Sequence, residues 1–211
     1  MVSSEEGNMS HYSSAQYRPS DENERFYYHL FFKKGEKIVD IGCSTGNFIA
    51  QDPSHITGMD ADKDAIMVAK KRGFDVRLHD VKKKFPYPSD SQQIVHSKHV
   101  LEHLDNPLPF MKEAYRILKK GGRLVLITDK MTPLFWDDYT HKRPYSVASL
   151  LQLAHDAGFG KANAEDFPLQ GVPGLGLLFR RGLVSGKTAR AIYRWYARNI
   201  SGSSLVLEAW K

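Results

Sequence analysis

Three aspartates lie twenty residues apart, and each closes a short stretch with apolar residues. They are Asp40, Asp60 and Asp80, and the first is followed at once by Gly42 and Gly46. A strand, a glycine turn and a helix form a nucleotide-binding corner in many folds, because backbone amides can approach a ligand closely there. The spacing therefore predicts a nucleotide-like ligand at this corner, with three carboxylates around it.

The spacing of the glycines argues against a phosphate ligand. Gly42 and Gly46 form G-x-x-x-G rather than the G-x-G-x-x-G of dinucleotide folds, and the Gly-Lys-Ser/Thr of a P-loop is missing. Asp40 beside the turn would repel a diphosphate and favour a cation, while Asp60 is placed to accept ribose hydroxyls. S-adenosylmethionine, an adenosine with a sulfonium and an ammonium group, fits these demands. Turn chemistry at Asp40 and a helix cap at Asp60 are the alternatives.

Buried strands and helices alternate along the chain, which predicts a parallel sheet with helices on both faces. Such a sheet binds its ligand at the carboxyl ends of its strands, where the three aspartates lie. We expect strands at 36–42, 55–61, 74–80, 91–97, 123–129 and 203–211, and helices at 21–32, from 47, 62–73, 106–121 and 146–159.

Four motifs in this order closely resemble the class I S-adenosylmethionine-dependent methyltransferases. They are "VDIGCSTGNF", "GMDADKDAI", "LHD" and "HVLEHLDNP…EAYRILKKGGRLVLITD". The resemblance covers residues 24 to 160 and the closing strand. It implies an α/β fold with a Rossmann-like, seven-stranded, mostly parallel sheet, helices on both faces and an antiparallel last strand.

The resemblance also implies roles for single residues at the strand ends, with S-adenosylmethionine as donor and S-adenosylhomocysteine as product. Ser44 stands where the family commonly has glycine, but a small residue still lets the backbone come close. The implied positions are Asp40, Gly42, Cys43 and Gly46 at the methionine and ribose, Asp60 at the ribose hydroxyls with Ala61 beside the adenine, Asp80 and Val81 at the adenine edge, and Ser97 under the methionine end.

The acceptor is suggested by "FWDDYTHKRPYSVASLLQLAHDAGF" after the fifth strand. It resembles a segment that lies over the methyl group in small-molecule and glycan methyltransferases. His141 is then the candidate general base, since a pKa near 6.5 suits proton removal at neutral pH; fixing the loop is its equal alternative. Arg143 would hold an anionic or hydroxyl-rich substrate, and Trp136, Tyr139 and Tyr145 would stack on a sugar. His99 and His103 are expected to support the pocket.

Other acceptors and cofactors are disfavoured by what the sequence lacks. "HSKHVLEH" replaces the Asn/Asp-Pro-Pro-aromatic motif of nucleobase amine methylation, and Cys43, the single cysteine, lies in the glycine turn, so cytosine-carbon methylation lacks its nucleophile. One cysteine also excludes an internal disulfide or a multi-cysteine zinc site. Asp129, Asp137 and Asp138 could be proposed as metal ligands, but loop acids are commoner than ligands, and we expect no metal.

The composition predicts one domain in the cytoplasm. A chain of 211 residues can bury one substantial core, and it carries neither a signal-peptide pattern nor an apolar run long enough to span a bilayer. We expect a mobile polar segment at 1–23 and a methyltransferase domain at 24–211. The net charge of +6 permits an anionic partner without requiring one.

A glycine-rich and basic segment at about 167–203 interrupts the alternation and is expected to be an insertion. Its helix 187–199 carries Lys187, Arg190, Arg194 and Arg198 on one face. A solvated helix over the sheet edge is the simpler interpretation, and peripheral contact with anionic lipid, suiting a lipid-linked substrate, is the alternative. Contact with nucleic acid is not favoured.

The function predicted from the sequence is O-methylation of a small-molecule or glycan/lipid-linked acceptor by direct in-line transfer. An RNA or protein methyltransferase is the first alternative. A donor-binding protein that needs a partner subunit for activity is the second.

Overall fold

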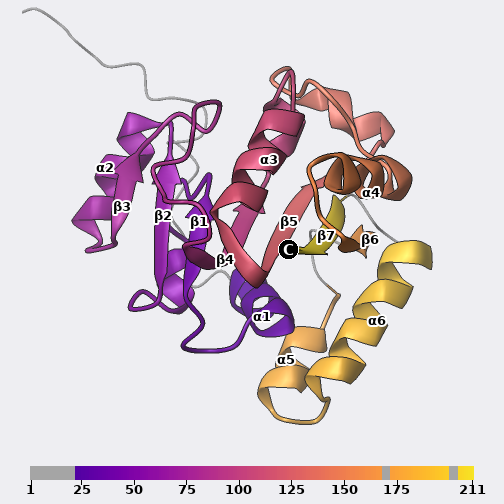
Figure 1. Ribbon diagram of the computed structural model, residues 1–211. Helices are drawn as coiled ribbons and strands as arrows, with labels where there is room; N and C mark the ends of the chain where they lie inside the picture. Colours follow the sequence, from indigo (N-terminus) through magenta and orange to yellow (C-terminus); the bar gives the residue numbers. More distant parts are fainter. Residues whose placement is uncertain (1–21, 168–171, 200–203) are drawn as a thin grey trace, which may run out of the picture.

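The computed structural model describes residues 22–167, 172–199 and 204–211. One seven-stranded sheet organises them, in the order β3-β2-β1-β4-β5-β7-β6. Only β7 runs antiparallel to its neighbours β5 and β6 (Figure 1). The predicted seven-stranded, mostly parallel sheet with an antiparallel last strand is therefore confirmed. The strands are β1 Ile38–Ile41, β2 Ile56–Asp60, β3 Val76–Leu78, β4 Gln92–Lys98, β5 Leu118–Asp129, β6 Lys161–Phe167 and β7 Ser204–Trp210.

Helices cover both faces of the sheet, and a separate hydrophobic cluster lies under each set. One cluster joins α3 and α4 to one face, and the other joins α1, α2, α5 and α6 to the opposite face. Because side chains alternate along a strand, Leu124 and Leu126 enter the first cluster while Val125 and Ile127 enter the second. The α-helices are α1 Glu22–Phe31, α2 Lys63–Lys71, α3 Leu108–Ile117, α4 Val147–Asp156, α5 Leu175–Arg180 and α6 Gly186–Asn199.

The prediction of an α-helix from residue 47 is wrong. The chain forms only one 3-10 turn, η1 Ile49–Gln51, before Asp52 leaves the helical region. The Asp52 carboxylate accepts hydrogen bonds from the amide of Gly35 and the hydroxyl of Tyr28, so it is held by distant residues. Pro53 follows directly and disfavours a helical conformation at Asp52. The strand pair β1–β2 is thus joined by a short, tight crossover.

Two further boundaries differ from the expectation. α3 ends at Ile117 rather than Gly121, because Leu118 is already extended and begins β5. The strand β6 was not expected, since "KANAEDF" has weak apolar alternation; its outer half is exposed and only Glu165 and Phe167 are buried. The start of α1 lies one residue from the predicted position, whereas Asp21 and most of the 1–23 segment lie outside the described residues.

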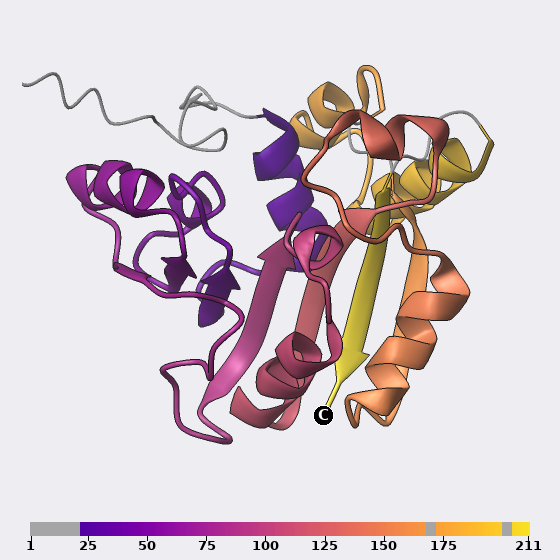
Figure 2. The same ribbon diagram turned by 90° about the horizontal axis from the view of Figure 1, so that it is seen from above.

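The parallel strands all point their carboxyl ends to one edge, which Figure 2 shows with α1, the segment after β5 and α5 gathered beyond it. The winding of the sheet reverses between β1 and β4, which are neighbours. Ligands of open α/β sheets bind at such a reversal. Two 3-10 turns lie on this edge, η2 Leu101–His103 after β4 and η3 Pro133–Asp137 after β5. Among the described residues, no helix combines the length and apolarity needed to cross a membrane.

Candidate active site at the carboxyl edge of the sheet

The glycine turn after β1 requires its glycines for backbone and packing reasons. Gly42 and Gly46 have φ values of 84° and 83°, which favour glycine. A Cβ added to Gly42 would lie 2.1 Å from Cγ2 of Val100, and one on Gly46 would lie 2.5 Å from the ring of Phe74. The turn is therefore packed tightly against the loop before β3 and the loop after β4.

Asp60 closes the turn from the end of β2. Its Oδ2 accepts the amide of Ser44 at 2.8 Å and its Oδ1 accepts the amide of Asp62 at 2.8 Å. Ser44 has a φ of 46°, so the hydrogen bond to Asp60 accompanies an uncommon backbone conformation. Burial raises the pKa of Asp60, against the two hydrogen bonds. This half-buried carboxylate joins the loops after β1 and β2.

The predicted adenine positions form an accessible rim beside Asp60. Ala61 is exposed, and Asp80 and Val81 are half-buried after the end of β3. The Asp80 carboxylate accepts the amide of Lys82 at 2.9 Å. The rim thus offers carboxylates, small side chains and backbone, which suit an uncharged nucleoside attached to a cation better than a phosphate.

Asp40, Cys43 and Ser97 do not present their side chains at this rim. Asp40 is 2% exposed and its Oδ1 lies 2.7 Å from Nδ1 of His96, which is equally buried. The Ser97 hydroxyl donates to the carbonyl of Ile41 at 2.8 Å and ties β4 to β1. Cys43 is buried, and burial raises the pKa of its thiol, so a nucleophilic thiolate is disfavoured. These side chains support the turn from beneath.

A second cluster of titratable side chains lies at the ends of β4 and β5. His99 Nδ1 is 2.9 Å from Glu102 Oε1 and 3.3 Å from Asp129 Oδ1. Burial lowers the pKa of His99, but the hydrogen bonds to Asp129 and Glu102 outweigh it and raise that pKa to about 9. His99 also has a φ of 55°. The cluster therefore holds an imidazolium in an uncommon backbone conformation, a combination that gathers at functional sites.

His141 lies beside this cluster with one ring nitrogen fixed. Its Nδ1 is 2.7 Å from the carbonyl of Phe135, which requires a proton on Nδ1. Its Nε2 then faces two carboxylates, Asp129 and Asp138, each at 3.8 Å. The ring is 9% exposed and packs against Phe135 and His103. This arrangement sets both the tautomer and the orientation of the imidazole, as a base requires.

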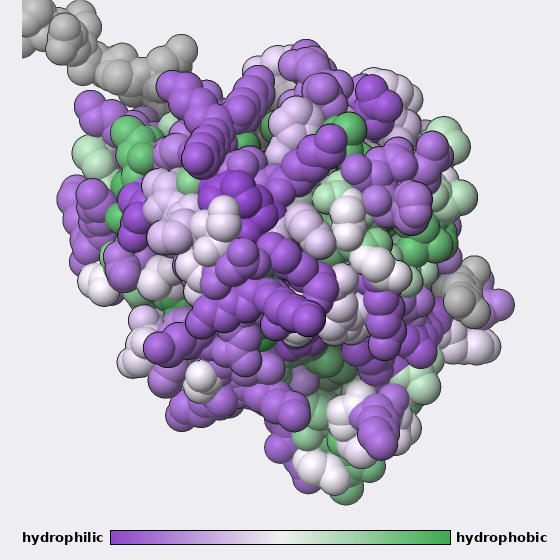
Figure 3. Space-filling model, in the orientation of Figure 1, coloured by the Kyte–Doolittle hydropathy of each residue, from purple (hydrophilic) through white to green (hydrophobic). Residues whose placement is uncertain are grey.

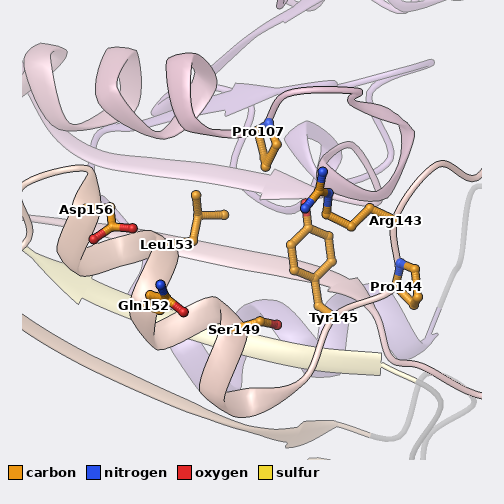
Figure 4. A pocket seen from close by; sticks show the side chains of 8 residues that line it. All are labelled: Pro107, Arg143, Pro144, Tyr145, Ser149, Gln152, Leu153 and Asp156. Carbon is orange, nitrogen blue, oxygen red and sulfur yellow. The ribbon is translucent and has the colours of Figure 1, made fainter.

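The predicted substrate residues separate into accessible and inaccessible ones. Trp136 and Tyr139 are 62% and 86% exposed on the segment after β5, so their rings can receive a ligand. Tyr145 is 2% exposed and its hydroxyl donates to the carbonyl of Leu101, so its ring is not placed to stack on a sugar. Arg143 is exposed and lines a pocket of about 280 Å³ between the start of α3 and α4 (Figure 4). Pro107, Tyr145, Gln152 and Leu153 contribute to the same pocket.

Two groups of side chains have the composition of a metal site. The ligand atoms of Glu102, His103 and His141 lie within 4.8 Å of one another, as do those of His99, Glu102 and Asp129. Glu102 is shared, and its two oxygens already accept hydrogen bonds from His99 and from Thr128. A cation would have to displace these bonds, so we interpret the groups as one hydrogen-bonded network.

Two of these features are not predicted from the sequence. Glu102 was not considered as a site residue, although it directly precedes His103 and follows a strand end. The Asp40–His96 pair joins residues that are register partners on β1 and β4, which only the sheet order reveals. Asp129, a possible metal ligand by its residue type, lies between His99 and His141.

The fold and this edge define a class of protein. A seven-stranded sheet with a reversed last strand, a glycine turn after β1 and an acid at the end of β2 are the features of the class I S-adenosylmethionine-dependent methyltransferases. Residues 39–126 match a family model described as "Methyltransferase domain", so this part of the chain is similar to the methyltransferases, and S-adenosylmethionine is the cofactor of the class that the fold defines.

Individual relatives agree with this assignment. The chain is 28% identical over 155 residues to phosphoethanolamine N-methyltransferase 3 of Arabidopsis thaliana. This match covers 65% of this chain and 31% of that protein. It is 26% identical over 107 residues to demethylmenaquinone methyltransferase of Listeria monocytogenes, 45% of each chain. A crystal structure of an S-adenosylmethionine-dependent methyltransferase from Archaeoglobus fulgidus superposes with a TM-score of 0.66 at 22% identity, covering 90% and 92% of the two chains. The chain spans 31% and 45% of the length of these two curated relatives.

Proposed function

We propose that this protein transfers the methyl group of S-adenosylmethionine to a hydroxyl group of a small-molecule or glycan/lipid-linked acceptor. The observation that carries the proposal is the fixed orientation of His141, with Nδ1 held by the Phe135 carbonyl and Nε2 directed at Asp129 and Asp138. An amine acceptor can lose its proton to water after transfer, whereas a hydroxyl needs a base at the moment of attack.

The donor would be held at the rim formed by the ends of β1, β2 and β3. Asp60 is half-buried and already anchored by two amides, so its carboxylate is oriented to accept ribose hydroxyls. Asp80, Val81 and the exposed Ala61 would surround the adenine. The backbone of Gly42 and Gly46 would approach the methionine part, while Asp40, Cys43 and Ser97 maintain the turn beneath it.

When bound, the donor supplies a methyl group already activated by its sulfonium. His141 Nε2 would take the proton of the acceptor hydroxyl as that oxygen attacks the methyl group. The carboxylates of Asp129 and Asp138 stabilise the resulting imidazolium by their charge. The Phe135 carbonyl keeps Nδ1 protonated throughout, so only one nitrogen exchanges a proton.

Recognition of the acceptor would rest on the segment after β5. Trp136 and Tyr139 offer exposed rings, which suit the apolar face of a sugar or another flat group. Arg143 would hold an anionic or hydroxyl-rich part of the acceptor from the neighbouring pocket. Tyr145 contributes only by positioning this segment, because its ring is buried.

The test measures how fast wild type, His141→Ala and His155→Ala label each fraction of a cell extract when methyl-labelled donor is supplied. His155 is the matched control, since it is an 87% exposed histidine on α4. We expect His141→Ala to lower the labelling rate about a hundredfold or more without changing donor affinity, and His155→Ala to behave as wild type. An unchanged rate in His141→Ala would refute its role as the base.

A second candidate is methylation of an amine that carries a phosphate. It is favoured by the similarity to phosphoethanolamine N-methyltransferase 3, the name of a relative only 28% identical to this chain. In that case amines would be labelled, and His141→Ala would label them as well as wild type does. Arg143→Ala would raise KM for the phosphorylated acceptor.

Two remaining alternatives have distinct outcomes in the same assay. Binding that falls steeply with salt and label in RNA would indicate a nucleic-acid substrate. Tight donor binding with no label in any fraction would indicate that a partner subunit is needed for activity.

A further inference from the structure

The segment between Asp166 and Glu208 carries charge of one sign only. It contains no aspartate or glutamate, whereas six cationic residues occur in it: Arg180, Arg181, Lys187, Arg190, Arg194 and Arg198. The net charge of the whole chain is also +6, so the rest of the sequence is electrically balanced. A segment of this composition has a particular use for its charges, either within the fold or towards an anionic partner.

Two of the arginines are used within the fold. Arg190 forms ion pairs with Glu208 and Glu165, and Arg194 forms one with Glu165, so both reach from α6 to the end strands β6 and β7. Glu165 and Glu208 are 7% and 6% exposed. Arg190 and Arg194 on the basic face of the helix at 187–199 are therefore turned towards the sheet, as the simpler interpretation of a helix over the sheet edge expects, whereas Lys187 at its start is exposed.

Further exposed cations lie around α5 and the turn that follows it. Arg180, Arg181 and Lys187 are exposed there, next to three leucines that are exposed as well. Leu177 and Leu178 are each 42% exposed and Leu183 is 67% exposed. We call these three leucines, with Arg181 and Lys187, the α5 tip.

The leucines of the α5 tip are not needed to hold α5 in place. The buried Leu175 anchors the helix on its inner side, and the ring of Phe179 packs at 5.4 Å from that of Phe26 on α1. Large apolar side chains that neither fill the core nor fold back cost solvation free energy, so several of them together on one short element mark a contact surface. Figure 3 shows pale and green atoms among purple ones over the tip formed by α5 and the start of α6.

The α5 tip lies on the same edge of the molecule as the candidate active site. α5 contacts α1, and Figure 2 shows both beyond the carboxyl ends of the strands, together with the segment after β5, while Figure 1 shows that this segment lies beside α4, away from α5. On that segment, Met131 and Trp136 are 66% and 62% exposed. The α5 tip and this segment thus share the carboxyl edge of the sheet, and each carries exposed apolar side chains.

We propose that the α5 tip docks this protein onto an anionic lipid surface. Leucines insert among the acyl chains near the headgroups, while Arg181 and Lys187 meet phosphate and carboxylate groups, which is the division of roles in interfacial helices. The uniform positive charge favours a lipid surface over a protein groove, which would need matched acids and fixed hydrogen bonds. Docking deepens the proposed function in one respect, since it would present a lipid-linked acceptor to His141.

The experiment measures binding of the full chain to vesicles by flotation, without donor or acceptor. Vesicles of phosphatidylcholine alone are compared with vesicles containing one quarter phosphatidylserine. The variants are Leu178→Glu/Leu183→Glu for the apolar part and Arg181→Glu/Lys187→Glu for the charged part. Leu78→Glu is the matched control, because Leu78 is a 53% exposed leucine on the edge strand β3.

We expect wild type and Leu78→Glu to float with the anionic vesicles, and both double variants to lose about tenfold or more of that affinity. Thermal unfolding of each variant checks that the fold is intact. Wild type that does not bind anionic vesicles, or double variants that bind as well as wild type, would overturn the proposal. Self-association abolished by Leu178→Glu/Leu183→Glu, with no vesicle binding, would assign the tip to a second copy instead. Because no turnover is measured, failure of the proposed methyl transfer would leave these results unchanged.

Discussion

His99 and His141 share one carboxylate but differ in what that carboxylate does to them. Asp129 lies 3.3 Å from His99 Nδ1 and 3.8 Å from His141 Nε2. His99 has a second acid, Glu102, at 2.9 Å, and together these raise its pKa to about 9 despite burial. His141 has its other nitrogen on a neutral carbonyl. At the residue scale, His99 is therefore a cation fixed between two acids, whereas His141 is held through a neutral carbonyl.

The raised pKa of His99 gives the protein a pH-dependent stability. A histidine with a folded pKa of about 9 and an unfolded pKa near 6.5 stabilises the fold fully below about pH 6.5, and that contribution is lost as the pH rises through 9. It amounts to at most about 3 kcal/mol. We expect the free energy of unfolding of wild type to fall between pH 7 and 10 more than that of His99→Asn.

Chemical denaturation at several pH values tests this expectation. Asparagine is the replacement of choice, because it does not titrate and tolerates the φ of 55° at this position. The difference between the two proteins should shrink as the pH rises. Parallel stability curves would show that His99 carries no extra proton in the folded state.

At the scale of elements, α4 connects the acceptor segment to the sheet. Ser146 caps it, with its hydroxyl oxygen accepting the amide of Ser149, and the Ser149 side chain accepts the amide of Ser146 in return. The buried Leu150 and Ala154 hold the helix on the core beneath β6 and β7. The segment that carries His141 and Arg143 is thus fixed at its far end by this cap.

We expect Ser146→Ala to lower the free energy of unfolding by about 1 kcal/mol, because it removes the hydroxyl oxygen that accepts the amide of Ser149. Gln152→Ala, an exposed substitution in the same helix, should change stability by less than about 0.5 kcal/mol. Urea unfolding of the three proteins measures both. Equal stability of Ser146→Ala and wild type would mean that water replaces the cap at no cost.

At the scale of the whole molecule, the sheet order brings together loops that are far apart in the chain. Ser44 and Asp60 meet through adjacent strands, and Ala61 and Asp80 lie at the ends of β2 and β3, so the donor would contact several loops at once. A ligand that binds only the folded state stabilises it by RT ln(1 + [L]/Kd). Donor binding should therefore raise the melting temperature of the entire domain.

We expect S-adenosylhomocysteine at a hundred times its Kd to stabilise wild type by about 2.7 kcal/mol, and Asp60→Ala to abolish most of this effect. Asp75→Ala is the control, since Asp75 is an exposed aspartate just before β3. Thermal unfolding with and without the ligand gives the answer. Full stabilisation of Asp60→Ala would remove Asp60 from the donor site.

The sequence alone determined the features that depend on neighbours in the chain. The N-caps Asp62 and Ser146 and the glycines that follow each helix are local signals for the ends of α2 and α4. Both helices lie where these signals predict. Apolar runs between turn signals predicted the buried strands and their order along the chain. The same pattern located the acids at the strand ends. The resemblance to a known class then supplied the seven-stranded sheet and its reversed last strand.

Tertiary structure decided where side chains point once strands are neighbours. Asp40 reads as a ligand in the sequence, but the pairing of β1 with β4 places His96 beside it, and a buried carboxylate needs such a partner. The sequence pattern predicts that Tyr145 stacks on the substrate, but its ring is buried on the loop after β5. The pattern also predicts a solvated basic face on α6, but Arg190 pairs with Glu165 and Glu208, and Arg194 pairs with Glu165. Burial and ion pairing depend on contacts between residues distant in sequence, and no local pattern encodes these, because they form only when the sheet and its covering helices assemble.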